Sequence, residues 1–299
     1  MGTVIGGVEL SRPEKELFPA SSVPAVTKRD LAIYYARVAH VLVPHVRGRP
    51  ISMERFPDGI DGPSFYEKRV PGHFPAFVPR VQVQTRDGSQ EQVMIDDERT
   101  LIYLANQACV TPHTWLSTAA DLQRPDQLMF DLDPTVPGLR RVRRATRLVG
   151  DLLTEVGLES YLKTTGSRGY HIVVPLRRGP SFDVTREFAR AVAEVLVHRA
   201  PEVVTTQARK NKRGHRVLID VQRNAYGQTA VPAYAVRARP GAPVAVPIRW
   251  ADLHRIGPAE HTIRSVPRRL AQIEDPWARI GAAAQELGPA LEKLRRLTP

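Results

Sequence analysis

Apolar residues at helical spacing predict the first long element of the chain, a helix that begins at Thr27. The hydroxyl of Thr27 is suited to cap the helix, and Asp30, three residues later, completes a capping-box pattern. Pro44 and Gly48 indicate where the helix ends. The stripe expected to face the core consists of Leu31, Tyr34, Val38 and Leu42.

Four more segments have a helical pattern. They begin near Asp97, Pro137, Asp183 and Trp277, and the first of them leads toward residues 111–115. The segment 137–156 has the clearest division into an apolar and a basic face, although a charged outer face is usually only solvated. The apolar face consists of Leu139, Val142, Leu148, Leu152 and Val156. The basic face consists of Arg140, Arg141, Arg143, Arg144 and Arg147.

Short apolar runs between these helices predict strands at residues 50–53, 129–133, 161–165, 170–175 and 217–221. A polar hairpin is expected at residues 80–92, around Asp87-Gly88. Helices and strands alternate unevenly, and the strands are joined by hairpins rather than by regular βαβ units. The pattern therefore predicts an α+β fold with mixed or antiparallel sheets flanked by helices.

One of these strands carries two aspartates. In Met129-Phe130-Asp131-Leu132-Asp133-Pro134 they are two residues apart, so that in an extended strand both point to one face. Neighbouring carboxylates repel each other unless a proton or a cation lies between them, and oxygen ligands without nearby cysteine favour Mg²⁺ or Mn²⁺. The alternative is a strand end with one capping and one solvated aspartate. Asp220, in the apolar run 217–221, also needs a cation or a partner if it is buried.

The composition adds a strong positive charge to this picture. The 299 residues include 43 Lys and Arg against 31 Asp and Glu, which gives a net charge of +12. Such an excess favours a polyanionic partner, although a general bias toward arginine gives the same count. Cys109 is the only cysteine, which excludes an internal disulfide and a cysteine-rich zinc site and suits a reducing cytoplasm. No stretch reaches the ~18 apolar residues of a membrane span, and the N-terminus lacks a signal-peptide pattern.

Two further segments suit contact with nucleic acid. Phe65 and Tyr66 precede Lys68 and Arg69, and an exposed aromatic beside these bases suits stacking on an unpaired base. Because adjacent strand residues face opposite sides, we expect one aromatic in the core and the other at the surface; the alternative places both in the core. The loop Gly166-Ser167-Arg168-Gly169 offers donors to a phosphate, and a dense basic turn follows at 209–216.

Taken in order, these segments are similar to one known family. The sequence resembles the polymerase domain of the bacterial multifunctional ATP-dependent DNA ligase D, of the archaeo-eukaryotic primase superfamily, from Lys15 to residues 275–277. Each motif is weak alone, but the ordered set is specific. The motifs are Phe65-Tyr66-Glu67-Lys68, His113-Thr114-Trp115, Asp131-Leu132-Asp133-Pro134, Thr165-Gly166-Ser167-Arg168-Gly169-Tyr170-His171, Ile219-Asp220 and Arg237-Ala238-Arg239.

The resemblance implies an architecture and roles for individual residues. It implies a single primase-polymerase domain over residues 1–299, with DNA 5′-phosphate and template contacts in an N-terminal α/β portion at about 1–110 and the catalytic core at about 111–299. The expected catalytic carboxylates, which would also hold two Mg²⁺ or Mn²⁺ ions, are Asp131, Asp133 and Asp220. The expected nucleotide contacts are Lys68, His113, Thr165, Ser167, Arg168, His171 and Arg237. The expected DNA contacts are Lys15, Lys28, Arg55, Phe65, Tyr66 and Arg213, with Lys15 and Lys28 on the 5′-phosphate of a gap or broken end.

Some of these roles have alternatives, and the sequence departs from the family pattern in places. His113 follows Pro112 at the expected end of a helix and is compatible with a structural role, as is a strand histidine such as His171. Arg168 replaces the more usual lysine, which keeps the charge but changes the expected phosphate contact. The other departures are Arg12 for an asparagine, Thr165 for a serine and Tyr66 for a second phenylalanine. No Lys-x-Asp-Gly ligase motif is present, so we expect a stand-alone relative or an excised domain.

The function that the resemblance implies is a template-dependent nucleotidyltransferase. It would fill gaps and extend primers at DNA ends in non-homologous end joining or related repair, favouring ribonucleotides as the family does. The expected partners are gapped or broken DNA, NTP or dNTP, Ku and an ATP-dependent DNA ligase, and we expect a monomer in the cytoplasm, associated with the nucleoid and not with a membrane.

Two other classes of function are weighed against it. A non-catalytic DNA-end-binding or bridging module would use the basic surface alone, but three intact aspartates argue against it. A metal-dependent nuclease or phosphoesterase usually adds histidine ligands, and the sequence places none adjacent to Asp131 or Asp133.

Overall fold

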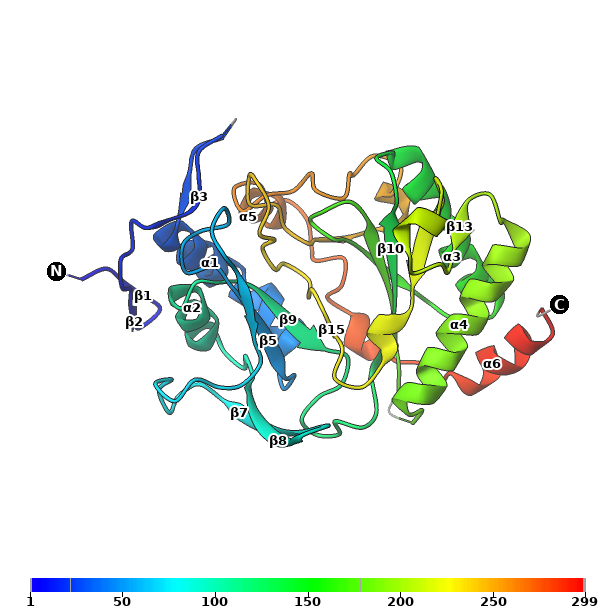
Figure 1. Ribbon diagram of the computed structural model, residues 1–299, viewed down its shortest axis with the longest axis horizontal. Coiled ribbons are helices and arrows are strands. Elements are labelled where there is room, and N and C mark those ends of the chain that lie inside the picture. The colour runs from blue at the N-terminus through cyan, green and yellow to red at the C-terminus, as the bar shows by residue number, and fades with distance from the viewer. Residues whose placement is uncertain (1, 22, 178, 298–299) are drawn as a thin grey trace. The chain divides into compact units, whose positions relative to one another are not determined.

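The computed structural model of the chain describes residues 2–21, 23–177 and 179–297 (Figure 1). Its internal contacts form two compact units. Unit 1 comprises Met1–Ala120, Thr229–Val246 and Ala259–Asp275, and unit 2 comprises Asp121–Gln228, Pro247–Pro258 and Pro276–Pro299. The first boundary thus lies near residue 120, and the chain later returns to unit 1 in two further segments. The assignment of residues 1–299 to one domain stays a prediction, whereas the α+β fold with antiparallel and mixed sheets is confirmed.

Unit 1 contains an antiparallel sheet in the order β15-β9-β5-β8-β7, with β6 paired to β5. Its strands are β5 (Ile51–Arg55), β6 (Phe65–Glu67), β7 (Arg80–Thr85), β8 (Gly88–Val93), β9 (Cys109–Trp115) and β15 (Thr229–Ala230). Two short pairs lie outside it, β1 (Val4–Ile5) with β2 (Val8–Glu9) and β3 (Glu16–Phe18) with β4 (Val26–Thr27). The expected hairpin at 80–92 is formed by β7 and β8.

The helices of unit 1 are α1 (Lys28–Val46), α2 (Glu98–Asn106) and the short α5 (Val266–Leu270). The capping box of Thr27 and Asp30 is confirmed at the start of α1. The predicted end is confirmed, because α1 ends at Val46, between Pro44 in its last turn and Gly48, which adopts a left-handed conformation with φ 67°. Helix α2 ends at Asn106, and Ala108 adopts a left-handed conformation with φ 57° just before β9 begins at Cys109. His113 therefore lies within a buried strand and not at a helix end.

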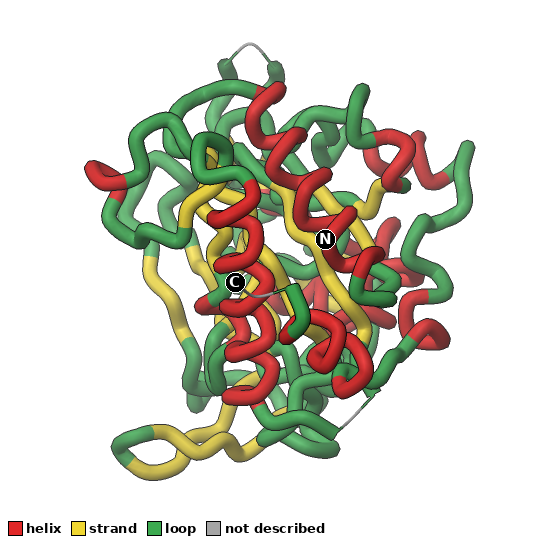
Figure 2. Tube along the Cα trace, turned by 90° about the vertical axis from the view of Figure 1, so that its right-hand side faces the viewer, coloured by secondary structure: helices red, strands yellow, loops and turns green. Residues whose placement is uncertain are grey.

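Unit 2 contains a six-stranded sheet in the order β13-β14-β10-β12-β11-β16. Among the described strands of this sheet, β13 and β14 pair in parallel and the other pairs are antiparallel. The strands are β10 (Gln127–Pro134), β11 (Tyr161–Thr164), β12 (Tyr170–Pro175), β13 (Val204–Thr205), β14 (Val217–Asp220) and β16 (Pro247–Ile248). Helices α3 (Leu139–Glu155) and α4 (Phe182–Arg199) pack against this sheet. Figure 2, seen from the right-hand side of Figure 1, shows helices in front of strands here.

Two expectations for unit 2 are corrected by its packing. Leu139 was expected on the inner face of α3 but is 46% exposed at the first position of the helix. The C-terminal segment is not one helix: a short 3-10 turn at Ile280–Ala283 is followed by α6 (Gly288–Arg295). Gly281 and Pro289 oppose a continuous helix there. None of the described helices has the length and apolarity that a membrane crossing requires.

Candidate active site

A row of polar side chains crosses four neighbouring strands of unit 2. The strand registers pair Lys163 with His171, His171 with Asp131, and Asp131 with Asp220. Residues paired across antiparallel strands point to the same face, so β11, β12, β10 and β14 each contribute one member. Asp133 lies two residues beyond Asp131 on β10 and shares that face. The three predicted carboxylates are therefore brought to one face of one sheet.

The contacts within the row define which nitrogen of His171 carries a proton. Lys163 and His171 are 1% and 4% exposed, and the Lys163 Nζ lies 2.7 Å from the His171 Nδ1. An ammonium has donors only, so Nδ1 accepts from Lys163 and the ring proton resides on Nε2. That Nε2 lies 3.3 Å from Asp131 Oδ1. His171 thus presents an N–H donor on the carboxylate face. The sequence analysis missed Lys163, although its place in the strand before the glycine loop puts it opposite His171.

The protonation states follow from burial and charge. Burial lowers the pKa of His171 to about 4, and the charge of Lys163 adds to this effect against the opposing pull of Asp131. Burial alone raises the pKa of Asp131, but His171, Arg223 and Lys163 outweigh it and bring that pKa to about 2. At neutral pH, Asp131 is an anion and His171 is a neutral donor.

Guanidinium groups hold the second carboxylate. Asp133 Oδ1 lies 3.3 Å from an amino nitrogen of Arg168, and its Oδ2 lies 3.2 Å from one of Arg213. Arg213 is further fixed by donating to the carbonyl oxygens of Gln207 and Ala208, at 2.9 and 2.7 Å. Arg213, which was predicted as a DNA contact, therefore lies against one of the predicted catalytic carboxylates. Arg223, which the sequence analysis did not single out, lies 3.8 Å from Asp131.

The glycine loop between β11 and β12 is held by the hydroxyl of Thr165. This hydroxyl donates to the Gly169 carbonyl at 2.9 Å and accepts from the backbone N–H groups of Ser167 and Gly169, each at 3.2 Å. A Cβ on Gly169 would lie 1.8 Å from the carbonyl oxygen of Leu132, so only glycine lets the loop approach β10 this closely. The loop places Arg168 beside Asp133. Nucleotide contact by Thr165 and Ser167 stays a prediction.

The carboxylates fit a divalent cation that takes only some of its ligands from the protein. Among the described residues, no group of three or more His, Cys, Asp and Glu side chains is close enough to hold a metal ion by itself. Mg²⁺ is commonly held by one or two carboxylates together with water and substrate phosphates. Asp131 and Asp133 can provide the carboxylates of such a set. Asp220 accepts from the backbone N–H of Gln222 at 2.8 Å and lines a cavity of about 380 Å³ with Arg213 and Arg190.

The prediction that no histidine adjoins the carboxylates is wrong, because His171 comes from the neighbouring strand. His171 and Asp131 are far apart in the sequence, so the spacing of residues did not indicate this contact. The Nδ1 of His171 is engaged by Lys163 and its Nε2 carries the proton, so the ring is a hydrogen-bond donor and not a metal ligand. The contact therefore does not create the histidine-rich ligand set of a nuclease.

The other predicted residues lie in unit 1. His113 on β9 is held by Glu54, with 3.0 Å between Nε2 and Oε2, and its ring packs edge-on against Tyr66. Burial raises the pKa of Glu54, but His113 and Arg237 outweigh it, so that the net pKa is lowered. Lys68 is exposed just beyond β6, and Arg237 is half-buried in the returning segment Thr229–Val246.

Phe65 and Tyr66 are both exposed, at 45% and 58%, so the expectation that one lies in the core is wrong. The reason is that β6 has only three residues and pairs with β5 alone, which leaves both of its faces uncovered. Arg55 stacks over the Phe65 ring at 5.4 Å and forms an ion pair with Glu67. This edge of unit 1 therefore offers aromatic faces and a fixed guanidinium.

Two lysines predicted to bind a 5′-phosphate lie near the start of α1. Lys28 is 4% exposed and donates to the carbonyl and hydroxyl oxygens of Ser11 at 2.7 and 3.2 Å. Burial, and then the charges of Arg12, Lys15 and Arg55, lower the pKa of Lys28 to about 8. Lys15 is paired with Asp58 at 2.9 Å. A cluster of like charges held this closely is typical of a site that receives an anion.

Comparisons with known proteins agree with this geometry. The family model described as the LigD primase-polymerase domain matches residues 27–277. The multifunctional non-homologous end joining protein LigD of Pseudomonas aeruginosa is 34% identical over 297 residues, which are 96% of this chain and 34% of that protein. The bifunctional LigD of Bacillus subtilis is 31% identical over 255 residues, 84% of this chain and 41% of that protein. This chain thus spans only about a third to two fifths of these relatives.

A solved structure has the same fold as this chain. The polymerase domain of Mycobacterium tuberculosis ligase D, in complex with DNA, superposes with a TM-score of 0.85 at 31% identity and covers 93% of this chain and 99% of that one. Family match, relatives and structure agree on one assignment. The chain belongs to the LigD primase-polymerase domain family, a family of nucleotidyltransferases.

Proposed function

We propose that this chain is a template-dependent polymerase that fills gaps and extends primers at DNA ends in non-homologous end joining. The observation that carries the proposal is the face of the unit 2 sheet on which Asp131, Asp133 and Asp220 lie beside the neutral donor His171. Anionic oxygens for a cation, next to donors for phosphate oxygens, are what nucleotidyl transfer requires.

Asp131, Asp133 and Asp220 are the residues proposed to hold two Mg²⁺ or Mn²⁺ ions. Bound divalent ions would lower the pKa of a primer 3′-hydroxyl and neutralise the leaving pyrophosphate. The chain's own contribution is to keep Asp131 ionised, since its pKa of about 2 prevents a proton from competing with a cation at neutral pH. Arg168 and Arg213 neutralise Asp133 until a nucleotide is present.

The incoming triphosphate is proposed to bind to donors that the fold already orients. In unit 2 these are the Nε2–H of His171, the guanidinium of Arg168, and the loop that Thr165 and Ser167 form. Arg168 is 55% exposed at its side chain, so it can exchange Asp133 for a phosphate oxygen at little cost. The residues proposed in unit 1 are Lys68, His113 and Arg237.

DNA is proposed to bind to the exposed features of unit 1. Phe65 and Tyr66 offer faces for stacking near the templating base, with Arg55 beside them. Lys15 and Lys28 are proposed for the 5′-phosphate of the downstream strand, and Arg213 of unit 2 for a further DNA contact. The finer expectations, a preference for ribonucleotides, recruitment by Ku and a DNA ligase, and action as a monomer on DNA in the cytoplasm, are proposed from the family resemblance.

One observation favours a second candidate, a non-catalytic DNA-end-binding module. Both oxygens of Asp133 are held by arginines, which is also how a structural ion pair is arranged.

The experiment that distinguishes the two candidates is extension of a labelled primer on a gapped duplex with a 5′-phosphate, with Mg²⁺ or Mn²⁺ and with NTP or dNTP. We expect templated addition that Asp133→Ala abolishes. Tight gap binding without addition under either metal would favour the binding module.

A further inference from the structure

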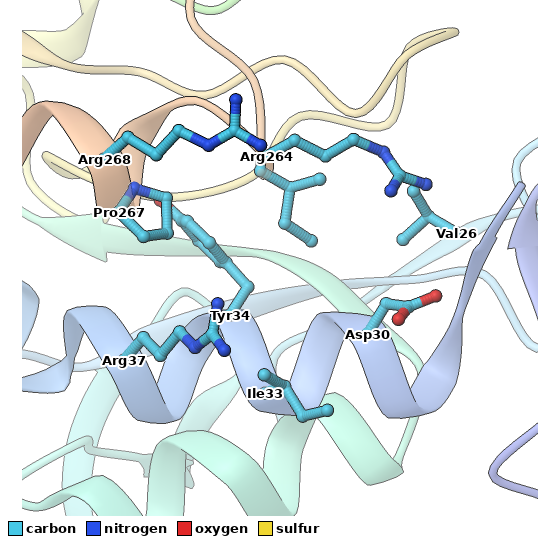
Figure 3. Close-up of a pocket in the computed structure, with 9 residues that line it drawn as sticks. Val26, Asp30, Ile33, Tyr34, Arg37, Arg264, Pro267 and Arg268 are labelled. Carbon is cyan, nitrogen blue, oxygen red and sulfur yellow. The ribbon is translucent and has the colours of Figure 1, made fainter. Parts of the chain in front are cut away.

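A pocket of about 280 Å³ lies in unit 1 between α1 and α5, apart from all the residues assigned above. We call it the α1–α5 pocket. Its lining includes Ile33, Tyr34 and Arg37 from α1 and Arg264, Pro267 and Arg268 from the α5 segment. Figure 3 shows Arg37 and Arg268 extending from the two helices, with Arg264 on the side of Val26 and Asp30. Three guanidinium groups therefore surround one small cavity.

The positive charge of the pocket is not balanced by the protein. In the described part of the chain, the side chains of Arg37 and Arg268 make neither a hydrogen bond nor an ion pair with any other residue. The guanidinium of Arg264 donates to the carbonyl oxygens of Pro24 and Ala25, at 3.2 and 3.1 Å, which carry no net charge to compensate it. The single acid of the lining, Asp30, is engaged in the capping box with the N–H and hydroxyl of Thr27, each at 2.9 Å.

Part of the pocket lining is apolar, and we call this part the apolar floor. Tyr34 is 2% exposed, and its hydroxyl donates to the carbonyl oxygen of Tyr234 at 2.8 Å, so its ring is the part that can face a ligand. Ile33 and Pro267 complete this surface. Charged rims over an apolar floor suit a ligand that has both an anionic group and an apolar part.

The pocket is separate from the lysines proposed for the 5′-phosphate. Arg37 follows Lys28 by nine residues, which at roughly 100° per residue places it about half a turn around α1. Lys28 points toward Ser11, whereas Arg37 borders the cavity against α5. A ligand in the pocket would therefore contact the opposite face of α1.

We propose that the α1–α5 pocket binds a backbone phosphate of a nucleic-acid strand, with the adjoining sugar on the apolar floor. Guanidinium forks match phosphate oxygens in pairs, and Arg37 and Arg268 are placed on two sides of one cavity. The chain carries a net charge of +12, and the similar M. tuberculosis domain was solved in complex with DNA. The pocket would be an additional anchor for DNA outside the gap.

The test compares two variants that lose the same charge. One is Arg37→Gln with Arg268→Gln. The other is Arg140→Gln with Arg141→Gln, two exposed arginines on α3 that also have no partner among the described residues. Binding is measured without nucleotide, on a gapped duplex whose 5′ end carries a hydroxyl, at several salt concentrations. The readout depends neither on the 5′-phosphate site nor on catalysis, so it remains valid if the polymerase proposal fails.

We expect the pocket variant to bind this DNA roughly tenfold more weakly, and the slope of log affinity against log salt to fall by about one, as for one lost phosphate contact. The α3 variant should keep the wild-type slope. Equal losses in the two variants would overturn the proposal. It would also be overturned if the pocket variant bound DNA normally but lost binding to polyglutamate, because the pocket would then suit an acidic peptide.

A second measurement places the DNA at the pocket directly. Cys109 is buried, so an Arg37→Cys variant has one accessible thiol. We expect saturating DNA to slow its reaction with a maleimide reagent at least threefold, while the thiol of an Arg140→Cys control is unaffected. Equal reactivity of the Arg37→Cys thiol with and without DNA would contradict the proposal.

Discussion

The carboxylate face of unit 2 and the β6 edge of unit 1 are built in opposite ways. On the unit 2 face, Lys163 and His171 are almost fully buried, and contacts link Lys163 to His171 and His171 to Asp131. On the β6 edge, the rings of Phe65 and Tyr66 are exposed on a three-residue strand. Reactive groups must be held within a fraction of an ångström, whereas stacking on any base needs only an accessible aromatic face. The difference is consistent with the proposal that unit 2 performs the chemistry and that this edge of unit 1 recognises DNA.

The largest effect is expected from the charge of Asp131. Asp131→Asn keeps the size of the side chain but removes the anion, so the rate of nucleotide addition should fall by roughly 1,000-fold or more. The measurement is single-turnover primer extension at saturating DNA, with gapped-DNA affinity as the control for folding. Wild-type rates in the Asp131→Asn variant would remove the carboxylate face from the mechanism.

The next effect tests whether Lys163 positions His171. Lys163→Met preserves much of the buried volume but leaves Nδ1 of His171 without its donor, so the ring proton is no longer confined to Nε2. We expect addition to slow by roughly 10- to 100-fold, as when the orienting partner of a ligand is lost.

The control for this prediction is a double-mutant cycle. If Lys163 acts only through His171, adding Lys163→Met to His171→Ala should cost little beyond the loss from His171→Ala alone. Fully additive losses would show that Lys163 has a separate role.

Removal of the β6 aromatics should produce the reverse pattern. Phe65→Ala with Tyr66→Ala should weaken binding of a template with an unpaired base by about tenfold, since stacking on each base contributes about 1–3 kcal/mol. Because both rings are exposed, the melting temperature should hardly change. A large drop in melting temperature at unchanged template affinity would mean that the rings serve packing instead.

The smallest effect is a pH dependence at Lys28. Its pKa of about 8 lies below the ordinary 10.5, so its positive charge is mostly present at pH 7 and mostly lost at pH 9. A 5′-phosphate stays a dianion over this range. The preference for a 5′-phosphate over a 5′-hydroxyl gap should therefore fall a few-fold between pH 7 and pH 9.

An arginine variant provides the control. Lys28→Arg keeps its charge at every pH in this range and should remove the pH dependence. A wild-type preference that is constant from pH 7 to pH 9 would argue against Lys28 as the phosphate ligand.

The sequence was sufficient wherever local pattern decides structure. The capping box of Thr27, the strand that aligns Asp131 with Asp133 and the glycine loop before β12 could all be predicted, because each depends on neighbouring residues. Lys163 could not be assigned a role in this way, because its contact with His171 depends on the pairing register of β11 and β12, which no local pattern predicts.

The same limit explains the errors. Phe65 and Tyr66 alternate as strand residues do, but only the sheet shows that β6 is an edge with no layer on either side. The contact between His171 and Asp131 joins residues 40 positions apart across two strands. Exposure and cross-strand contact are properties of the assembled sheet, so they lie beyond periodicity and spacing.

The most direct test of the division of labour is a paired measurement on gapped DNA with an unpaired templating base. Affinity and the addition rate at saturating DNA are determined for Asp131→Asn and for Phe65→Ala with Tyr66→Ala. We predict that the first variant loses the rate and keeps the affinity, and that the second loses affinity and keeps the rate. Loss of affinity in Asp131→Asn with an unchanged rate at saturation would contradict the assignment of the chemistry to the carboxylate face of unit 2.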